Sequence, residues 1–377
     1  MERANDSGRV LVVGAGISGA TIANLISSSS EGNVHVIDRR GNIGGNCFDY
    51  KDGNGITVHK YGSHILNTSD RDVYDFLKQF TDLNDYVHKV VASIDGKETY
   101  LPFNLNSLYD LFPEQTAKNM ESKLLSKYQL GDDIPILDML LQGDEEIRSL
   151  AEYIYKKLFL NYTVKHWGLS PKEIDYSVTA RVPVRISRDD RYFQETHQGI
   201  PSEGYSKMIL RMLEMPNISV KLRTEFNDIA DKEQYDHIFY TGSIDELMGY
   251  RYGPLPYRSL RFELETHDKE YYQSNSVFNF PNEHNYTRIH EFKYYLNEKS
   301  SKTTIAKEYP EPFEQGRNER FYPIPRKENQ NLYRRYLKDA FKTYGNIHFL
   351  GRLGDYKYYD MDKAVLRAMQ VFEEVFG

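Results

Sequence analysis

Three glycines and one aspartate near the N-terminus have the types and the spacing that bind a dinucleotide. Gly14, Gly16 and Gly19 follow one apolar run, and Asp38 closes a second apolar run. In such a unit the first glycine allows a tight turn, the second lets the backbone reach a pyrophosphate, and the third lets the helix pack against the strand. The pyrophosphate lies at the helix N-terminus, and the acid accepts a hydrogen bond from a ribose hydroxyl. The spacing therefore predicts a nucleotide-cofactor site; the alternative is a glycine-rich turn without a ligand.

A second glycine-rich turn follows at Arg40–Asn46, close enough in the sequence to lie over the same cofactor. Its paired Gly44 and Gly45 suit the close approach of backbone to a phosphate or a flavin. His59 and His64 lie five residues apart on the next turn, which favours one imidazole against a flavin ring. Histidines that bond only to backbone are the alternative. We predict no metal site, because no cysteine or carboxylate cluster accompanies the histidines at ligand spacing.

Three arginines are candidates for holding a diphosphate, because a guanidinium forms paired hydrogen bonds with phosphate oxygens. They are Arg181, Arg185 and Arg288, and a surface ion pair is the alternative for each. Trp167, the only tryptophan, occurs in a polar, basic and loop-like stretch, which favours a stacking platform for a planar base. The segment 347–362 predicts a strand, a glycine turn and a helix start, whose positive end would face a flavin pyrimidine. An aspartate that only caps this helix is the alternative.

Together these motifs resemble the bacterial UDP-galactopyranose mutases, flavoenzymes that interconvert the pyranose and furanose forms of UDP-galactose. The resemblance extends over nearly the whole chain. The matching blocks are GAGISGA at Gly14–Ala20, RRGNIGGN at Arg39–Asn46, HKYGSH at His59–His64, LPFNLNSL at Leu101–Leu108, Tyr162–Gly168, RVPVR at Arg181–Arg185, QGIP at Gln198–Pro201, YTRIHE at Tyr286–Glu291, YPIP at Tyr322–Pro325 and GRLGDYKYYDMD at Gly351–Asp362.

The resemblance implies a noncovalent FAD that is active when reduced, and a reaction through an adduct between flavin N5 and the sugar. Arg181, Arg288 and His64 are implied as catalytic residues, the two arginines by stabilising the UDP that leaves. The implied substrate contacts are Tyr162, Thr163, Trp167, Arg181, Tyr192, Asn279, Arg288, Tyr322, Tyr358, Asp360 and Asn67. The implied cofactor contacts are Gly14, Gly16, Ser18, Gly19, Asp38, Arg39, Gly45, Asn46, Gly62, His64, Arg352, Tyr359, Asp360 and Met361. A nucleotide-sugar substrate, an external reductant such as NAD(P)H and a homodimer are also implied.

The chain departs from the family pattern at positions that bear on the substrate. Asn67 occupies a place where relatives usually have a histidine that faces the sugar, so the identity of the hexose is open. Two further departures affect the part of the site that is expected to bind the nucleotide. Leu158 replaces the usual aromatic residue, and the stretch between Asn279 and Arg288 is shorter. The alternatives are a related mutase acting on another nucleotide sugar such as dTDP-fucopyranose, a flavin-dependent amine oxidase or dehydrogenase, and a nucleotide-sugar binding protein without catalysis.

Three structural parts must position these residues. Apolar residues recur at helical spacing over 105–160, whereas short, aromatic and β-rich segments occupy 259–295. Strands that run into glycine at 235–242 and 347–351 are expected to return the chain to a parallel sheet. The predicted fold class is α/β, a Rossmann-type FAD-binding domain with an inserted helical bundle and an antiparallel β-sheet domain. The expected boundaries are 1–100, 203–250 and 335–377 for the FAD-binding domain, 101–175 for the helical domain, and 176–202 and 251–334 for the β-sheet substrate domain.

The composition narrows the class of protein. A chain of 377 residues is longer than one that folds around a single hydrophobic core, so we predict two or three domains. The single cysteine, Cys47, fits a reducing compartment, and without an apolar leader or a long apolar stretch we expect a cytoplasmic protein that does not insert into a membrane. The net charge of -7 argues against a partner nucleic acid, although a few local arginines suffice for a small anionic ligand.

Overall fold

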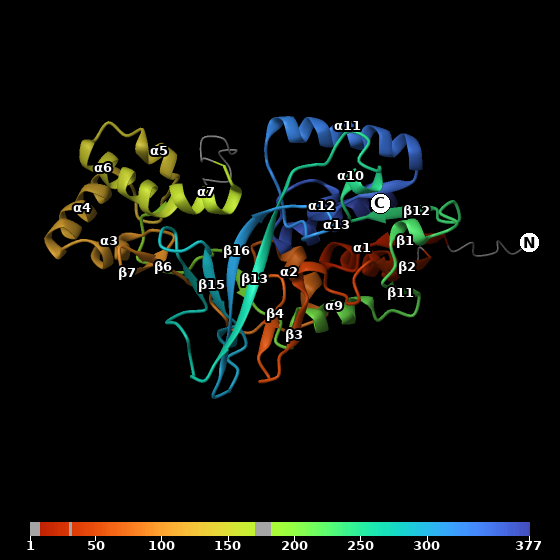
Figure 1. Cartoon of the computed structure of the whole chain (residues 1–377), viewed down its shortest axis with the longest axis horizontal. Helices are drawn as coiled ribbons and strands as arrows, with labels where there is room; N and C mark the ends of the chain where they lie inside the picture. The colour runs from red at the N-terminus through yellow and green to blue at the C-terminus, as the bar shows by residue number, and fades with distance from the viewer. Residues whose placement is uncertain (1–7, 30–31, 170–181) are drawn as a thin grey trace, which may run out of the picture.

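The computed structural model describes residues 8–29, 32–169 and 182–377. A parallel sheet with its helices lies at one end of the molecule and a group of helices at the other (Figure 1). Between them run two long paired strands, β13 (Tyr257–His267) and β16 (Thr303–Pro312), which belong to a second sheet. The predicted combination of a Rossmann-type domain, a helical part and a largely antiparallel sheet is confirmed.

The first sheet is entirely parallel and carries the predicted cofactor motifs. Its order is β11 (Ile218–Leu222), β2 (Asn33–Asp38), β1 (Arg9–Val13), β12 (His237–Tyr240) and β18 (Ile347–Phe349). Both faces are covered, which explains the continuous apolar character of β1. The side chains of Val10 and Val12 enter the core formed with α1 (Ile17–Ser28), α9 (Tyr205–Leu213) and α13 (Met361–Phe376). Leu11 points to the opposite core, formed with α10 (Ile244–Leu247) and α11 (Lys327–Tyr344).

The second sheet has the order β17 (Tyr322–Pro323), β13, β16, β15 (Arg288–Glu291), β14 (Val277–Asn279), β6 (Val90–Ile94) and β7 (Lys97–Leu101). It is antiparallel except for the pair β14 and β6. We expected residues 1–100 to belong to the FAD-binding domain. The strands β6 and β7, at the end of that range, pair within the second sheet instead. The turn between them places Asp95 and Gly96 at positive φ, so that the hairpin folds back before the chain enters the helices.

The helical part contains α3 (Leu105–Leu111), α4 (Glu114–Lys127), α5 (Ile136–Leu140), α6 (Glu145–Ile154) and α7 (Asn161–Trp167), with a π-helical turn, η2 (Tyr155–Leu160), between the last two. The predicted face of Leu150, Ile154 and Leu158 is buried in its core. The prediction of a loop around Trp167 was wrong. This segment is α7, which continues the helical path of α6 and ends at Gly168 with φ +67°.

The remaining elements are short and connect these parts. They are η1 (Gly45–Cys47), β3 (Asp49–Lys51), β4 (Thr57–His59), β5 (Leu66–Thr68), α2 (Arg71–Lys78), β8 (Asp133–Ile134), β9 (Val184–Arg185), β10 (His197–Gly199), η4 (Phe226–Asp228), η5 (Phe292–Tyr294) and α12 (Gly351–Gly354). β10 pairs with β5, although we expected its segment in the sheet domain. Among the helices of the described chain, none is long and apolar enough to cross a membrane.

Candidate active site

The two glycine-rich turns meet at one cavity, which we call the first cavity. A Cβ on Gly45 would lie 2.8 Å from the Cα of Gly16, and a Cβ on Gly19 would lie 1.8 Å from the carbonyl oxygen of Gly14. These positions therefore accept only glycine, and their backbone stays open to a ligand. The predicted residues that line this cavity are Gly14, Gly16, Ser18, Gly19, Asp38, Arg39, Gly45, Asn46, His64, Arg352, Tyr359, Asp360 and Met361.

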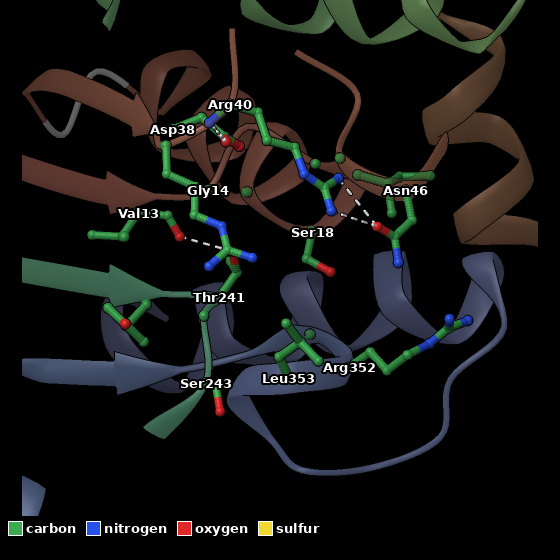
Figure 2. Close-up of a pocket in the computed structure, with 18 of the residues that line it drawn as sticks. Val13, Gly14, Ser18, Asp38, Arg40, Asn46, Thr241, Ser243, Arg352 and Leu353 are labelled. Carbon is green, nitrogen blue, oxygen red and sulfur yellow. Dashed lines mark hydrogen bonds between the residues drawn. The ribbon is translucent and has the colours of Figure 1, made fainter. Parts of the chain in front are cut away.

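Asp38 holds the glycine turn in place. Its carboxylate accepts hydrogen bonds from the backbone N–H of Ala15 and of Arg40, both at 2.8 Å. The Arg40 side chain in turn donates to Asn46 at 3.1 and 3.2 Å within the second glycine turn (Figure 2). The backbone N–H of Gly44 donates to the carbonyl oxygen of Ala15 at 2.8 Å, which links this turn to the first. Asp38 thus has a structural task that the sequence did not predict, and its contact with a ribose stays a prediction.

A second cavity lies between the second sheet and the helical part. The predicted residues that line it are Gly62, His64, Asn67, Tyr162, Thr163, Trp167, Tyr192, Asn279, Arg288, Tyr322, Arg352, Tyr358, Asp360 and Met361. Gly62, expected to contact the cofactor, lines this cavity and not the first. His64, Arg352, Asp360 and Met361 line both cavities. The cavities therefore adjoin at these four residues.

The three arginine candidates have different outcomes. Arg288 lines the second cavity. Arg185 does not line either cavity, and its buried side chain forms a two-pronged ion pair with Asp133 at 2.8 and 3.1 Å. This ion pair, rather than a diphosphate, accounts for Arg185. Arg181 lies outside the described residues.

Strand register explains how Arg288 is positioned. Asn279 on β14 faces Arg288 on β15, and Arg288 faces Glu308 on β16, so the three side chains form a row across the sheet. The Oδ1 atom of Asn279 is buried and has no hydrogen-bond partner within the described chain, as expected of an atom that awaits a ligand. Sequence analysis missed Glu308, because no motif surrounds it and β16 was not predicted.

Glu308 is a buried carboxylate with three side-chain partners, of which the Thr287 hydroxyl donates to Oε1 at 3.2 Å. The Glu308 side chain is 1% exposed, and it accepts from Nε of Arg288 at 2.9 Å and from Nε2 of His290 at 3.0 Å. Burial alone would raise the pKa of Glu308, but the Arg288 guanidinium and the His290 N–H hold that pKa well below its usual range. Within the described chain, no side chain or backbone group accepts from the Nη atoms of Arg288, so these stay available to an anion.

The histidines near the junction of the cavities are neutral. Burial lowers the pKa of His64 to about 3, with smaller effects from His59 and Arg352. The Nδ1 atom of His64 lies 2.7 Å from the carbonyl oxygen of Gly62 and must donate to it, which leaves Nε2 as an acceptor. Among the described residues, no group of three or more histidine, cysteine and carboxylate side chains is placed to hold a metal.

Helix α7 carries the aromatic wall of the second cavity. Arg258 of β13 donates to the carbonyl oxygens of His166 and Lys165 at 2.8 and 3.2 Å and so fixes the end of α7 against the sheet. The rings of Trp167 and Tyr322 lie next to each other, with centroids 6.1 Å apart. Burial raises the pKa values of the Tyr322 and Tyr162 hydroxyls well above their usual range, so these groups stay protonated and can donate.

Asn67 lies on β5 at the edge of the second cavity. Its side chain is mostly buried, and Nδ2 donates to the carbonyl oxygen of Ile65 at 3.2 Å. The amide is therefore held by local backbone, and a longer side chain at this position would extend into the cavity.

Comparison with known proteins identifies the family. The family model for UDP-galactopyranose mutase matches residues 157–358, and a model for an NAD(P)-binding Rossmann-like domain matches 12–80. A protein of Klebsiella pneumoniae named "Probable UDP-galactopyranose mutase" is 35% identical over 97% of this chain and 94% of its own length. The chain belongs to the UDP-galactopyranose mutase family. The predicted enzyme class, an isomerase of this mutase type, is thereby confirmed.

Two further relatives refine the comparison. A dTDP-fucopyranose mutase of Escherichia coli is 34% identical over 96% of this chain and 97% of its own length. A crystal structure of reduced UDP-galactopyranose mutase has the same fold, with a TM-score of 0.73 at 17% identity over 98% of this chain and 96% of that chain. The family therefore contains proteins with different named substrates at nearly the same identity to this chain.

We predict that Cys47 is unreactive in the folded protein. Burial raises the pKa of its thiol to about 12, and Sγ contacts Sδ of Met361 at 3.4 Å. Iodoacetamide at pH 8 should leave the intact mass unchanged in the folded protein and add one adduct in guanidinium chloride, because only the thiolate reacts. Stoichiometric labelling of the folded protein would show that Cys47 is accessible to reagents and to a covalent cofactor linkage.

Proposed function

We propose that this chain converts UDP-galactopyranose to UDP-galactofuranose, using a noncovalent FAD in its reduced form. The observation that carries the proposal is the junction of the two cavities at His64, Arg352, Asp360 and Met361. A cofactor in the first cavity and a nucleotide sugar in the second would meet there. Membership of the mutase family supports the same assignment.

The first cavity has features that fit FAD. The two glycine-rich turns leave room for a pyrophosphate beside the N-terminus of α1. Helix α13 begins at Met361, which lines the same cavity, so its positive end is also close to a bound cofactor. Arg352 is fixed by a hydrogen bond from Nη2 to the carbonyl oxygen of Tyr359 at 2.6 Å. A reduced flavin bound here supplies a nucleophilic N5 for the anomeric carbon and is regenerated without net oxidation.

The residues of the second cavity would bind and orient the nucleotide sugar. Negative charge develops on the diphosphate as the bond to the sugar breaks, and the free Nη atoms of Arg288 are placed to stabilise it. Arg181 is the second arginine that the family resemblance implies. The protonated hydroxyls of Tyr162 and Tyr322 would donate to the same phosphate oxygens. Neutral His64 can accept a hydrogen bond through Nε2 at the junction.

Three finer predictions remain with this proposal. The reductant is an external donor such as NAD(P)H, the protein is a homodimer, and it acts in the cytoplasm. All three follow from the family resemblance or from the composition.

The central experiment compares the oxidised and the reduced protein. The purified protein should be yellow, release FAD on denaturation, and form UDP-galactofuranose only after reduction by dithionite, because N5 is nucleophilic only in the reduced flavin. Furanose product is measured by chromatography. Turnover should consume no stoichiometric reductant, which separates a mutase from an amine oxidase or dehydrogenase. Equal turnover by the oxidised protein, or a colourless protein that takes up no FAD, would overturn the proposal.

We predict that Arg288→Ala removes most activity while FAD stays bound. The variant loses a charge-assisted contact to the leaving diphosphate, about 2 to 4 kcal/mol in the transition state, or roughly 30- to 1,000-fold in kcat/KM. Arg288→Lys should rescue little, since one ammonium cannot bond both Glu308 and a phosphate as the planar guanidinium does. The matched control is Arg261→Ala, because Arg261 pairs with Glu263 and Glu311 on the same sheet. Equal rates for the two alanine variants would place the diphosphate elsewhere.

A second candidate substrate is dTDP-fucopyranose, because a dTDP-fucopyranose mutase is among the relatives and Asn67 lines the second cavity at a position where the family resemblance implies a histidine. If asparagine is an adaptation, Asn67→His should change the ratio of kcat/KM for the UDP- and dTDP-sugars by roughly tenfold or more, since one polar contact is worth about 1 to 3 kcal/mol. A change below roughly twofold, with UDP-galactose preferred by the unaltered protein, would remove the dTDP-sugar candidate.

A further inference from the structure

Beside Arg288, the wall of the second cavity contains a chain of buried hydrogen bonds through Glu308, His290 and Ser63. The carboxylate of Glu308 bonds Nε2 of His290 at 3.0 Å, and Nδ1 of His290 lies 2.5 Å from Oγ of Ser63. Ser63 Oγ also bonds the hydroxyl of Tyr295, which is 1% exposed. Ser63 is brought there by Gly62, whose φ is +89° and whose Cβ, if present, would lie 2.9 Å from the ring of Phe262.

The Glu308 carboxylate at one end of this chain determines which group donates and which accepts in each hydrogen bond. The Glu308 carboxylate is paired with Arg288 and only accepts, so Nε2 of His290 carries the proton. Nδ1 of the neutral ring must then accept, and the Ser63 hydroxyl is its donor. The Ser63 oxygen in turn accepts from the Tyr295 hydroxyl. All donors thus point toward one carboxylate.

The neighbouring groups favour this arrangement. Burial lowers the pKa of His290, although Glu308 acts in the opposite direction, so the ring is neutral. His59 and His88, whose pKa values burial lowers to about 3, are neutral as well. Arg288 and Glu308 then form the charged pair at this end of the cavity. The relay of His290, Ser63 and Tyr295 is neutral, and it holds Oε2 of the Glu308 carboxylate.

We propose that Ser63 and His290 are positioning residues, which hold the Glu308 carboxylate in one orientation so that Arg288 presents its Nη atoms to the diphosphate of a nucleotide sugar. The diphosphate part of this inference rests on the proposed function. The relay uses Oε2 of Glu308, whereas Arg288 and the Thr287 hydroxyl use Oε1, so a rotation of the carboxylate would break these contacts together. In this role Ser63 acts on the diphosphate through His290, Glu308 and Arg288.

The relay is tested first by histidine nitrogen NMR on the FAD-loaded protein labelled with ¹⁵N. The His290→Asn variant identifies the His290 signals by their loss. We expect a protonated Nε2 and an unprotonated Nδ1 at pH 7. A ring protonated on Nδ1, or on both nitrogens, would overturn the direction of the relay and the proposal with it.

The functional consequence is tested by calorimetric titration of UDP into the FAD-loaded protein. Ser63→Ala should weaken UDP binding by at least roughly fivefold, since a buried acceptor loses its donor, and should raise KM more than it lowers kcat. Ser63→Thr, which keeps the hydroxyl, should restore most of the affinity. The matched control is Ser259→Ala, because Ser259 is a buried serine of β13 whose hydroxyl has no partner in the described chain.

The outcomes separate this proposal from the proposed function. Unchanged UDP affinity in Ser63→Ala, or an equal loss in Ser259→Ala, would overturn the relay even if the protein is an active mutase. Weakened UDP binding in Ser63→Ala but not in Ser259→Ala, together with a His290 ring protonated on Nε2 alone in the NMR experiment, would support the relay even if the protein forms no furanose. If Ser63→Ala does not fold, the NMR experiment on the unaltered protein and the Ser63→Thr titration still decide.

Discussion

The arrangement of the second cavity depends on the ion pair between the buried carboxylate of Glu308 and Arg288. Taking a carboxylate out of water costs several kcal/mol unless charge and hydrogen bonds replace the lost hydration. Arg288 and His290 supply that replacement from the neighbouring strand, where register places Arg288 opposite Glu308 and His290 two residues further along. The arginine is thereby fixed through Nε, and its Nη atoms remain for a ligand. In the proposed function, stability and ligand recognition would thus use the same ion pair.

The first cavity depends on a different constraint, the close approach of two stretches of backbone to each other. Gly16 and Gly45 bring two turns within van der Waals contact, and Asp38 ties the first turn to the second strand of the sheet. The chain between the second turn and His64 brings His64 to the junction, whereas Arg352, Asp360 and Met361 come from α12 and the start of α13. The cofactor motif and the arginine row are built separately, and His64 lies where they meet.

Sequence analysis recovered what has local signals. The glycine turns, the returning strands at 237–240 and 347–349 and the face of Leu150 and Ile154 follow from spacing alone. Glu308 could not be predicted, because its importance arises from pairing with β15 across the sheet. We predicted a loop around Trp167 because the neighbouring residues are polar and show no helical pattern. The segment is a short helix, and the hydrogen bond from Arg258, far away in the sequence, fixes its end. The site roles assigned by resemblance remain predictions.

The most direct test of the account is a crystal structure of the protein with FAD and UDP bound. The account predicts the flavin in the first cavity with its reactive edge at the junction near His64, and a diphosphate oxygen within hydrogen-bond distance of the Nη atoms of Arg288. Glu308 should keep its contacts to Arg288 and His290 in that complex. A diphosphate bound away from Arg288, or a flavin ring far from the second cavity, would contradict the account.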